Sequence, residues 1–198
     1  MTVRDIINMI VVLTVVSLVC GGGLAMVKMA TAEQVEYQKI KNVKEPALKK
    51  ILSDYDNDPV SDRKTIITGK DSKGKDIKTT IFYAKKGGKL IAVAFEAYGS
   101  GYGGPIGVVM SINQPDEVLG AIAATTNSET PSVGGIVMAS SELRDQYAGK
   151  PVDANFGLNS AGGIINAISG ATMSSIGVST AVKNGMEIYK KYKSDILG

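Results

Sequence analysis

An uncharged run of 22 residues, Ile6–Val27, constrains this chain more than any other feature of its sequence. The run is dense in Val, Ile and Leu. At about 1.5 Å of rise per residue it forms enough helix to cross a hydrocarbon core of about 30 Å. Arg4 and Lys28 bracket it. We therefore expect residues 1–32 to form a retained single-span membrane anchor in contact with lipid.

Two other interpretations of this segment are weaker. A cleavable signal peptide would fit the small residues Ala30-Thr31-Ala32, but the apolar run is longer than a usual signal core. A lipoprotein would carry its lipid on Cys20, but the bulky Val19 stands where a small residue is expected. The length of the run thus favours an anchor.

The lysines near the span bear on its orientation. Lys28, Lys39, Lys41 and Lys44 follow the span, whereas only Arg4 precedes it. By the positive-inside rule this count, taken alone, predicts a cytoplasmic domain.

Composition excludes several classes of function. With 22 Lys and Arg against 19 Asp and Glu, the net charge is only +3, so we expect no nucleic-acid partner. The chain has no His and one Cys, so it cannot build a His-containing zinc site, a His-ligated haem, a four-cysteine iron–sulfur cluster or a Ser-His-Asp triad. Redox work would therefore require an organic cofactor.

Residues 33–198 indicate one α+β domain. A helical pattern over 33–54 is interrupted at Pro46, and a stronger helix is predicted over 175–193. A further helix is expected over 134–150. Short β-like runs separated by turns predict an antiparallel meander, with strands at 65–69, 76–84, 89–98, 105–112 and 118–125.

The segment just before the C-terminal helix has the features of a phosphate site. Ser169-Gly170-Ala171-Thr172 places three small residues ahead of a hydroxyl, and Ser174 or Ser175 is a plausible helix N-cap. Small side chains let a phosphate approach the unpaired N–H groups at a helix start. A plain N-capped loop is the alternative.

Together with other motifs, this segment resembles the G subunit of Rnf complexes and the related C subunit of sodium-pumping NADH:quinone reductases. That family carries an S-G-A-T motif whose threonine is esterified to the phosphate of FMN. The stretch KEPALKKIL, then Gly101–Ile106, then Glu129-Thr130-Pro131 precede the motif in the family's order. The sequence departs from the family at three places. It has Asn166 where the family usually has Asp, Asn127 where His is common, and Ser132-Val133 where Gly-Leu is common.

The resemblance implies a covalent FMN on Thr172, attached by a separate FMN transferase, because no residue in the chain is suited to activate a threonine. Ser174 is a secondary candidate for the attachment. The resemblance also implies a flavin pocket built from the motif and the two preceding segments. Its expected members are Ser169, Gly170, Ala171, Thr172, Ser174, Tyr102, Gly103, Gly104, Pro105, Glu129, Thr130 and Val133.

In function, the resemblance implies a flavoprotein that relays electrons between the other subunits of an Rnf-type complex, which links ferredoxin and NAD to ion translocation. It places the domain on the periplasmic or extracellular face of the plasma membrane, against the lysine count. Two alternatives stay open. One is a flavin carrier in a system like the sodium-translocating NADH:quinone reductase, and the other is an anchored assembly module without a cofactor.

Overall fold

The computed structural model of the chain describes residues 3–70, 74–132 and 134–198. Val133, one of the expected pocket residues, lies outside these ranges. The chain divides into two compact units, Met1–Lys41 and Asn42–Gly198.

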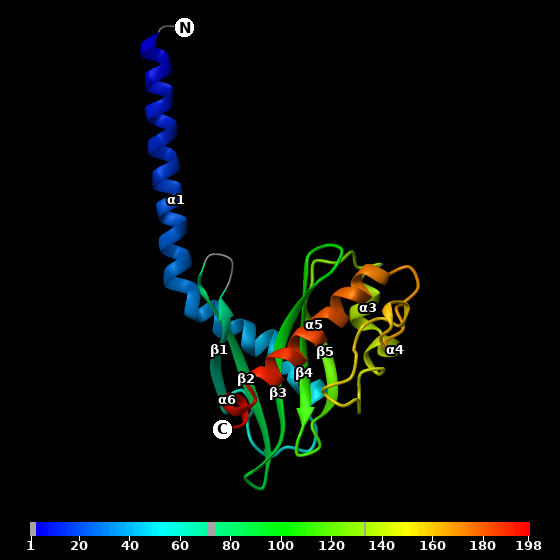
Figure 1. Ribbon diagram of the computed structural model, residues 1–198. Helices are drawn as coiled ribbons and strands as arrows, with labels where there is room; N and C mark the ends of the chain where they lie inside the picture. The colour runs from blue at the N-terminus through cyan, green and yellow to red at the C-terminus, as the bar shows by residue number, and fades with distance from the viewer. Residues whose placement is uncertain (1–2, 71–73, 133) are drawn as a thin grey trace. The chain divides into compact units, whose positions relative to one another are not determined.

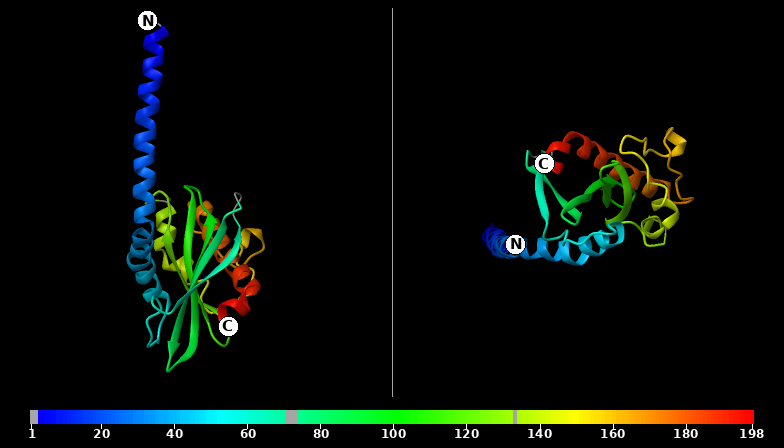
Figure 2. Two further views of the ribbon diagram at one scale, coloured as in Figure 1. Left: turned by 90° about the vertical axis from the view of Figure 1, so that its left-hand side faces the viewer. Right: turned by 90° about the horizontal axis from the view of Figure 1, so that it is seen from below.

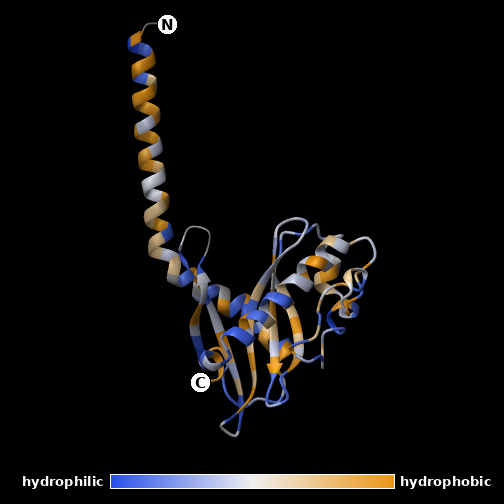
Figure 3. Ribbon diagram, in the orientation of Figure 1, coloured by the Kyte–Doolittle hydropathy of each residue, from blue (hydrophilic) through white to orange (hydrophobic). Residues whose placement is uncertain are grey.

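The first unit is a long helix, α1 (Val3–Lys39). By length and composition its stretch Val3–Ala32 is able to cross a membrane, and the apolar residues dominate it in Figure 3. Two hydroxyls within the stretch are satisfied locally: Thr14 donates to the carbonyl of Ile10 and Thr31 to that of Val27, at 2.8 and 2.7 Å. Neither hydroxyl proton is therefore left unpaired, as a helix that spans a membrane would require.

A short π-helix, η1 (Ile40–Lys44), follows α1 and leads into α2 (Glu45–Ile51). Pro46 lies in the first turn of α2, where the missing N–H of proline costs no hydrogen bond. The predicted interruption at Pro46 is therefore the start of a new helix.

Five strands form one sheet in the order of the sequence, and each neighbouring pair is antiparallel. The predicted meander is confirmed. The strands are β1 (Arg63–Lys70), β2 (Asp76–Lys86), β3 (Lys89–Ser100), β4 (Pro105–Asn113) and β5 (Val118–Thr126).

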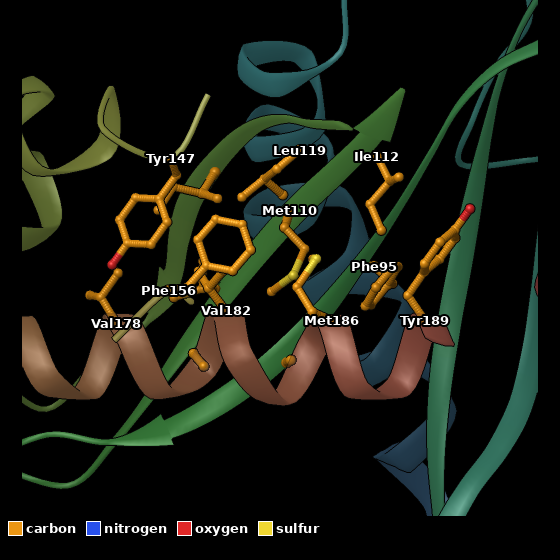
Figure 4. Close-up of a cluster of buried hydrophobic side chains, with 14 of the residues drawn as sticks. Phe95, Met110, Ile112, Leu119, Tyr147, Phe156, Val178, Val182, Met186 and Tyr189 are labelled. Atoms are coloured by element: carbon orange, nitrogen blue, oxygen red, sulfur yellow. The ribbon is translucent and has the colours of Figure 1, made fainter. Parts of the chain in front are cut away.

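One face of the sheet is covered by the C-terminal helix α5 (Thr172–Lys191), drawn in orange to red in Figure 1. Apolar residues at helical spacing form its buried stripe. Figure 4 shows this stripe packed among side chains of the strands and of the segment before α5. Its labelled members are Val178, Val182, Met186 and Tyr189, with Phe95, Met110, Ile112, Leu119, Tyr147 and Phe156 around them.

The opposite face of the sheet is covered by α2, so the domain has three layers, which the right-hand view of Figure 2 shows end on. Ala47, Leu48 and Ile51 are buried there. The Ser111 hydroxyl of β4 also donates to the carbonyl of Ile51 at 3.2 Å. The α+β class, with an antiparallel sheet and a C-terminal helix, is as predicted.

Two helix predictions are wrong in detail. The single helix expected over 134–150 is two short ones, α3 (Gly134–Ala139) and α4 (Ser141–Arg144), because Ser140 between them has an extended backbone. Helix α5 begins at Thr172 rather than at 175, and Ala171 occupies the N-cap position.

The serines predicted as N-caps lie inside the first turn of α5. The Ser175 hydroxyl donates to the carbonyl of Ala171 at 3.0 Å and accepts the N–H of Ile168 at 3.1 Å. It thus fastens the preceding loop to the helix instead of capping it. The remaining short elements are η2 (Asn159–Ala161) before α5 and α6 (Lys193–Leu197) after it.

Candidate cofactor-binding site

A pocket of about 420 Å³ lies at the N-terminal end of α5. Its volume is within the range of about 300–1,000 Å³ typical of small-molecule and cofactor sites. Three separate parts of the sequence form its wall: the loop after β3, the segment after β5 and the start of α5. The lining residues are Tyr102, Glu129, Thr130, Gly134, Gly170, Ala171, Thr172, Met173 and Ser174.

Thr172 is the first residue of α5 and is exposed in the wall of this pocket. The first backbone N–H groups of a helix have no partner within it, and the helix dipole gives this end a partial positive charge. The N-cap residue Ala171 has no side chain able to occupy that end. The start of α5 therefore favours an anionic group, such as a phosphate, beside the Thr172 hydroxyl.

The loop before Thr172 leaves this end of the helix open. Gly170 has a φ of +79°, a left-handed conformation that suits glycine, and no heavy atom lies within 4 Å of where its Cβ would be. Ser169 is exposed beside it but does not line the pocket. The small residues of the motif thus leave space next to the threonine.

Glu129 is the only charged residue among the described residues that line the pocket, and it is buried, with 8% of its surface exposed. Its Oε2 accepts the hydroxyl proton of Ser174 at 2.5 Å, and its Oε1 accepts the N–H of Gly103 at 2.9 Å. The Ser174 bond is the largest cause that lowers the pKa of Glu129, and it outweighs the opposing effect of burial; the Gly103 and Tyr102 N–H groups add to it. Glu129 is therefore an ionised carboxylate that joins two parts of the wall.

Close packing around this carboxylate explains two glycines. A Cβ on Gly134 would collide with Glu129 Oε2, and a Cβ on Gly101 would collide with Glu129 Oε1. Both positions therefore admit only glycine without a shift of the carboxylate.

The end of β3 and the glycine-rich loop after it, residues 101–104, pack directly on α5. A Cβ on Gly177 would lie 2.9 Å from the Cα of Gly101, and a Cβ on Gly99 would collide with the backbone carbonyl of Gly177. The loop itself is closed by the Gly101 N–H, which donates to the carbonyl of Gly104 at 2.8 Å. The glycines of this loop therefore bring its backbone against the helix that begins with Thr172.

The pocket brings together seven of the residues that the sequence singled out: Tyr102, Glu129, Thr130, Gly170, Ala171, Thr172 and Ser174. Gly103 contacts the site through Glu129. Gly104, Pro105 and Ser169 do not line the pocket, and Pro105 instead opens β4.

Two lining residues were not singled out from the sequence, Gly134 and Met173. Met173 was not expected in the wall because the sequence predicts that the helix begins at residue 175, three residues later than the observed start at Thr172. Gly134 opens α3, and only the contact between its backbone and Glu129 reveals its importance.

The pocket lies within a stretch of the chain that is similar to a known family. Residues 101–187 match the model of the FMN-binding domain family. This segment includes the glycine-rich loop, Glu129 and Thr172, and so contains every described residue that lines the pocket.

The curated relatives bear the name of the G subunit of an ion-translocating oxidoreductase complex. The one from Cereibacter sphaeroides is 29% identical over 148 residues, which cover 72% of this chain and 65% of the relative, so this match leaves about a third of the relative unmatched. The one from Shewanella baltica is 26% identical over 190 residues, which cover 93% of this chain and 89% of the relative. The resemblance to the G subunits of Rnf complexes is confirmed.

Among solved structures, the chain is similar to Shewanella oneidensis NqrC, with a TM-score of 0.49 and 20% identity over 62% of each chain. The match to the Shewanella baltica relative covers 93% of this chain and so overlaps the segment 101–187, which contains the described residues that line the pocket.

Proposed function

We propose that this chain carries FMN, joined by a phosphoester bond to Thr172, in the pocket at the start of α5. The observation that carries the proposal is the exposed hydroxyl of Thr172 in the pocket wall, within the segment that matches the FMN-binding domain family. The motif predicted this residue, and the fold supplies a cavity beside it.

The charges of the pocket favour a covalent bond over simple binding. No Lys or Arg is among the described lining residues, and the one charged group there, Glu129, is negative. The helix end is then the main favourable charge for a phosphate, and a helix dipole contributes only about 0.3–1 kcal/mol at an exposed site. A covalent bond to Thr172 would hold the cofactor where electrostatics alone holds it weakly.

Thr172 suits the attachment better than Ser174. Ser174 is 2% exposed, and its hydroxyl proton is donated to Glu129. A transferase could not reach it without opening the helix start. Thr172 is exposed and carries no such bond among the interactions of the described residues.

Attachment requires a partner enzyme and an activated donor. The chain has no His, and the carboxylate in the pocket wall, Glu129, already accepts two hydrogen bonds. We propose that an FMN transferase deprotonates the threonine and that the donor carries the FMN phosphate as an anhydride, as in a flavin dinucleotide. A bond forms from Thr172 Oγ1 to the phosphorus of FMN, and the anhydride P–O bond breaks. The other nucleotide of the donor leaves with the electron pair of that bond.

When bound, FMN supplies electron-transfer chemistry that the protein's own side chains lack. The chain's residues hold it: Thr172 fixes the phosphate end, and Tyr102 and Met173, both exposed in the wall, offer aromatic and apolar surface. Glu129 keeps the two sides of the wall together.

In the cell, we propose that the chain relays electrons as one subunit of an Rnf-type complex that links ferredoxin and NAD to ion translocation. Residues 1–32 would anchor it in the plasma membrane, with residues 33–198 on the periplasmic or extracellular side. The apolar α1 and the relatives' names support this role.

The test is the intact mass of the full-length protein purified from its native membranes, read together with flavin fluorescence after denaturing electrophoresis. We expect a mass raised by one FMN less one water, with fluorescence that survives denaturation. Thr172→Ala should lose both signals, whereas the flavin that Ser174→Ala carries should still be on Thr172. An unmodified mass from cells that contain an active FMN transferase would overturn the proposal and favour the cofactor-free module.

A further inference from the structure

We propose that Glu129 is a positioning residue for flavin attachment: its carboxylate sets the start of α5 against the glycine-rich loop and so holds Thr172 at the pocket. This inference rests on the proposed function. In it, Glu129 affects Thr172 indirectly, through its hydrogen bonds to Ser174 and Gly103.

The carboxylate spans two segments that are far apart in the sequence. Oε2 accepts the Ser174 hydroxyl from the first turn of α5, at 2.5 Å, and Oε1 accepts the Gly103 N–H from the loop after β3, at 2.9 Å. Ser174 is two residues from Thr172. Because both residues lie in the first turn of α5, a bond that holds Ser174 also restrains the backbone from which the Thr172 hydroxyl projects.

The ionised state of Glu129 strengthens this connection. A hydrogen bond to a charged acceptor is roughly twice as strong as one between neutral groups. The pKa of Glu129 lies below its ordinary range, chiefly through the Ser174 bond, so the carboxylate stays charged at neutral pH.

The backbone of two glycines packs closely against this carboxylate. Gly101 and Gly134 pack against its two oxygens so closely that a Cβ on either would collide with it. The Glu129 N–H also donates to Asn127 Oδ1 at 3.2 Å, which fixes the segment after β5. These contacts enclose one carboxylate, which accepts the Ser174 hydroxyl proton and so leaves Thr172 as the exposed hydroxyl in the first turn of α5.

A displaced Thr172 should react more slowly with the transferase. Misplacement of a reacting group by about 1 Å can slow a reaction on the order of 10²-fold. The surface that the transferase recognises stays the same, so the loss should fall on kcat rather than on KM.

The experiment measures flavin attachment to the full-length protein in detergent, with a flavin dinucleotide and an FMN transferase, by intact mass against time. Glu129→Gln removes the charge. Gly134→Ala keeps the charge but displaces the carboxylate with a methyl group. Glu142→Gln makes the same change as the first variant on an exposed glutamate outside the pocket and serves as its matched control.

We expect Glu129→Gln and Gly134→Ala to lower the kcat of attachment roughly 10- to 100-fold with KM nearly unchanged, while Glu142→Gln reacts like the wild type. In a double-mutant cycle, Ser174→Ala should add little to the effect of Glu129→Gln, because both variants disrupt the same charged Ser174–Glu129 contact.

Val182→Ala serves as a control for a general loss of stability. Val182 lies in the hydrophobic core on α5 and does not line the pocket. The variant should reduce thermal stability without slowing attachment. Wild-type kcat in Glu129→Gln, or equal slowing in Val182→Ala at matched stability, would overturn the inference. A wild-type protein that accepts no flavin would instead overturn the proposed function itself.

Discussion

The ammonium of Lys44 lies 2.9 Å from Glu96 Oε2, so a charged pair joins the end of η1 to the middle of β3. The Glu96 carboxylate also accepts hydrogen bonds from the hydroxyls of Tyr98 and Thr125. Its side chain is almost fully buried on the face of the sheet that α2 covers. The pair therefore fastens the helical segment at the start of the domain to the strand that leads into the glycine-rich loop.

Replacing Lys44 should show how much this ion pair contributes to the free energy of unfolding. We expect Lys44→Met to lower the free energy of unfolding by about 2 kcal/mol, less than the roughly 3–5 kcal/mol of a fully buried pair, because the Lys44 side chain is 22% exposed. Urea unfolding of the full chain in detergent measures this. Lys49→Met breaks the surface pair with Glu45 on the adjacent helix and should change stability little. Equal effects of the two variants would show that the Glu96 pair has no special role.

Acid should destabilise the domain through the same carboxylate. Burial alone would raise the pKa of Glu96, but the Thr125 hydroxyl and Lys44 outweigh it and lower the pKa. A pKa lowered on folding gives stability that is fully present well above the ordinary glutamate pKa of about 4.3 and is lost as the pH falls through the folded value. Urea midpoints should therefore be flat from pH 7 to about pH 5.5 and fall below about pH 4.5.

Glu96→Gln checks the cause of that pH dependence. Its midpoint should be lower at pH 7 and should fall less steeply on acidification, since one titrating group is gone. Glu142→Gln is the control and should follow the wild-type curve. Parallel curves for Glu96→Gln and the wild type would contradict the assignment.

The packing of the glycine-rich loop on α5 predicts a large effect of one methyl group. In Gly177→Ala the new Cβ would lie 2.7 Å from Ile106 Cδ1 and 2.9 Å from Gly101 Cα. We expect a loss of about 1–3 kcal/mol, the usual cost of overpacking, measured by thermal unfolding. Gly69→Ala is the matched control, because its Cβ would meet only Ile77 Cδ1, at 3.9 Å. A neutral Gly177→Ala would mean that the loop does not depend on this contact.

The sequence predicted the sheet well because each strand has a local pattern and a clear turn after it. The sequence does not indicate the start of α5, because one of the contacts that holds it is not local: Ser174 bonds to Glu129, 45 residues away along the chain. The helix expected over 134–150 is interrupted at Ser140, which has an extended backbone. The pattern of apolar residues in this segment does not indicate that interruption.

The residues of the candidate site also differ in how far the sequence predicts them. Thr172 and its small neighbours were found by a motif, whereas Gly134 and the role of Glu129 come only from contacts made in the fold. Residues that carry chemistry leave a local trace in the sequence. Residues that hold them in place often do not.

The side of the membrane on which the domain lies is a separate prediction, since the lysine count and the family resemblance disagree. We expect the extracytoplasmic side. A Cys20→Ser, Glu142→Cys variant carries a single exposed thiol outside the span, and a membrane-impermeant maleimide should label it in intact cells. Labelling only after the cells are opened would place the domain in the cytoplasm.

The measurement that tests the central claim most directly is tandem mass spectrometry of one tryptic peptide from the native protein. Cleavage after Arg144 and Lys183, with no cut before Pro151, yields residues 145–183, which contain both Thr172 and Ser174. The account predicts that this peptide carries FMN and that its fragments place the added mass on Thr172. An unmodified peptide, or a flavin on Ser174, would contradict it.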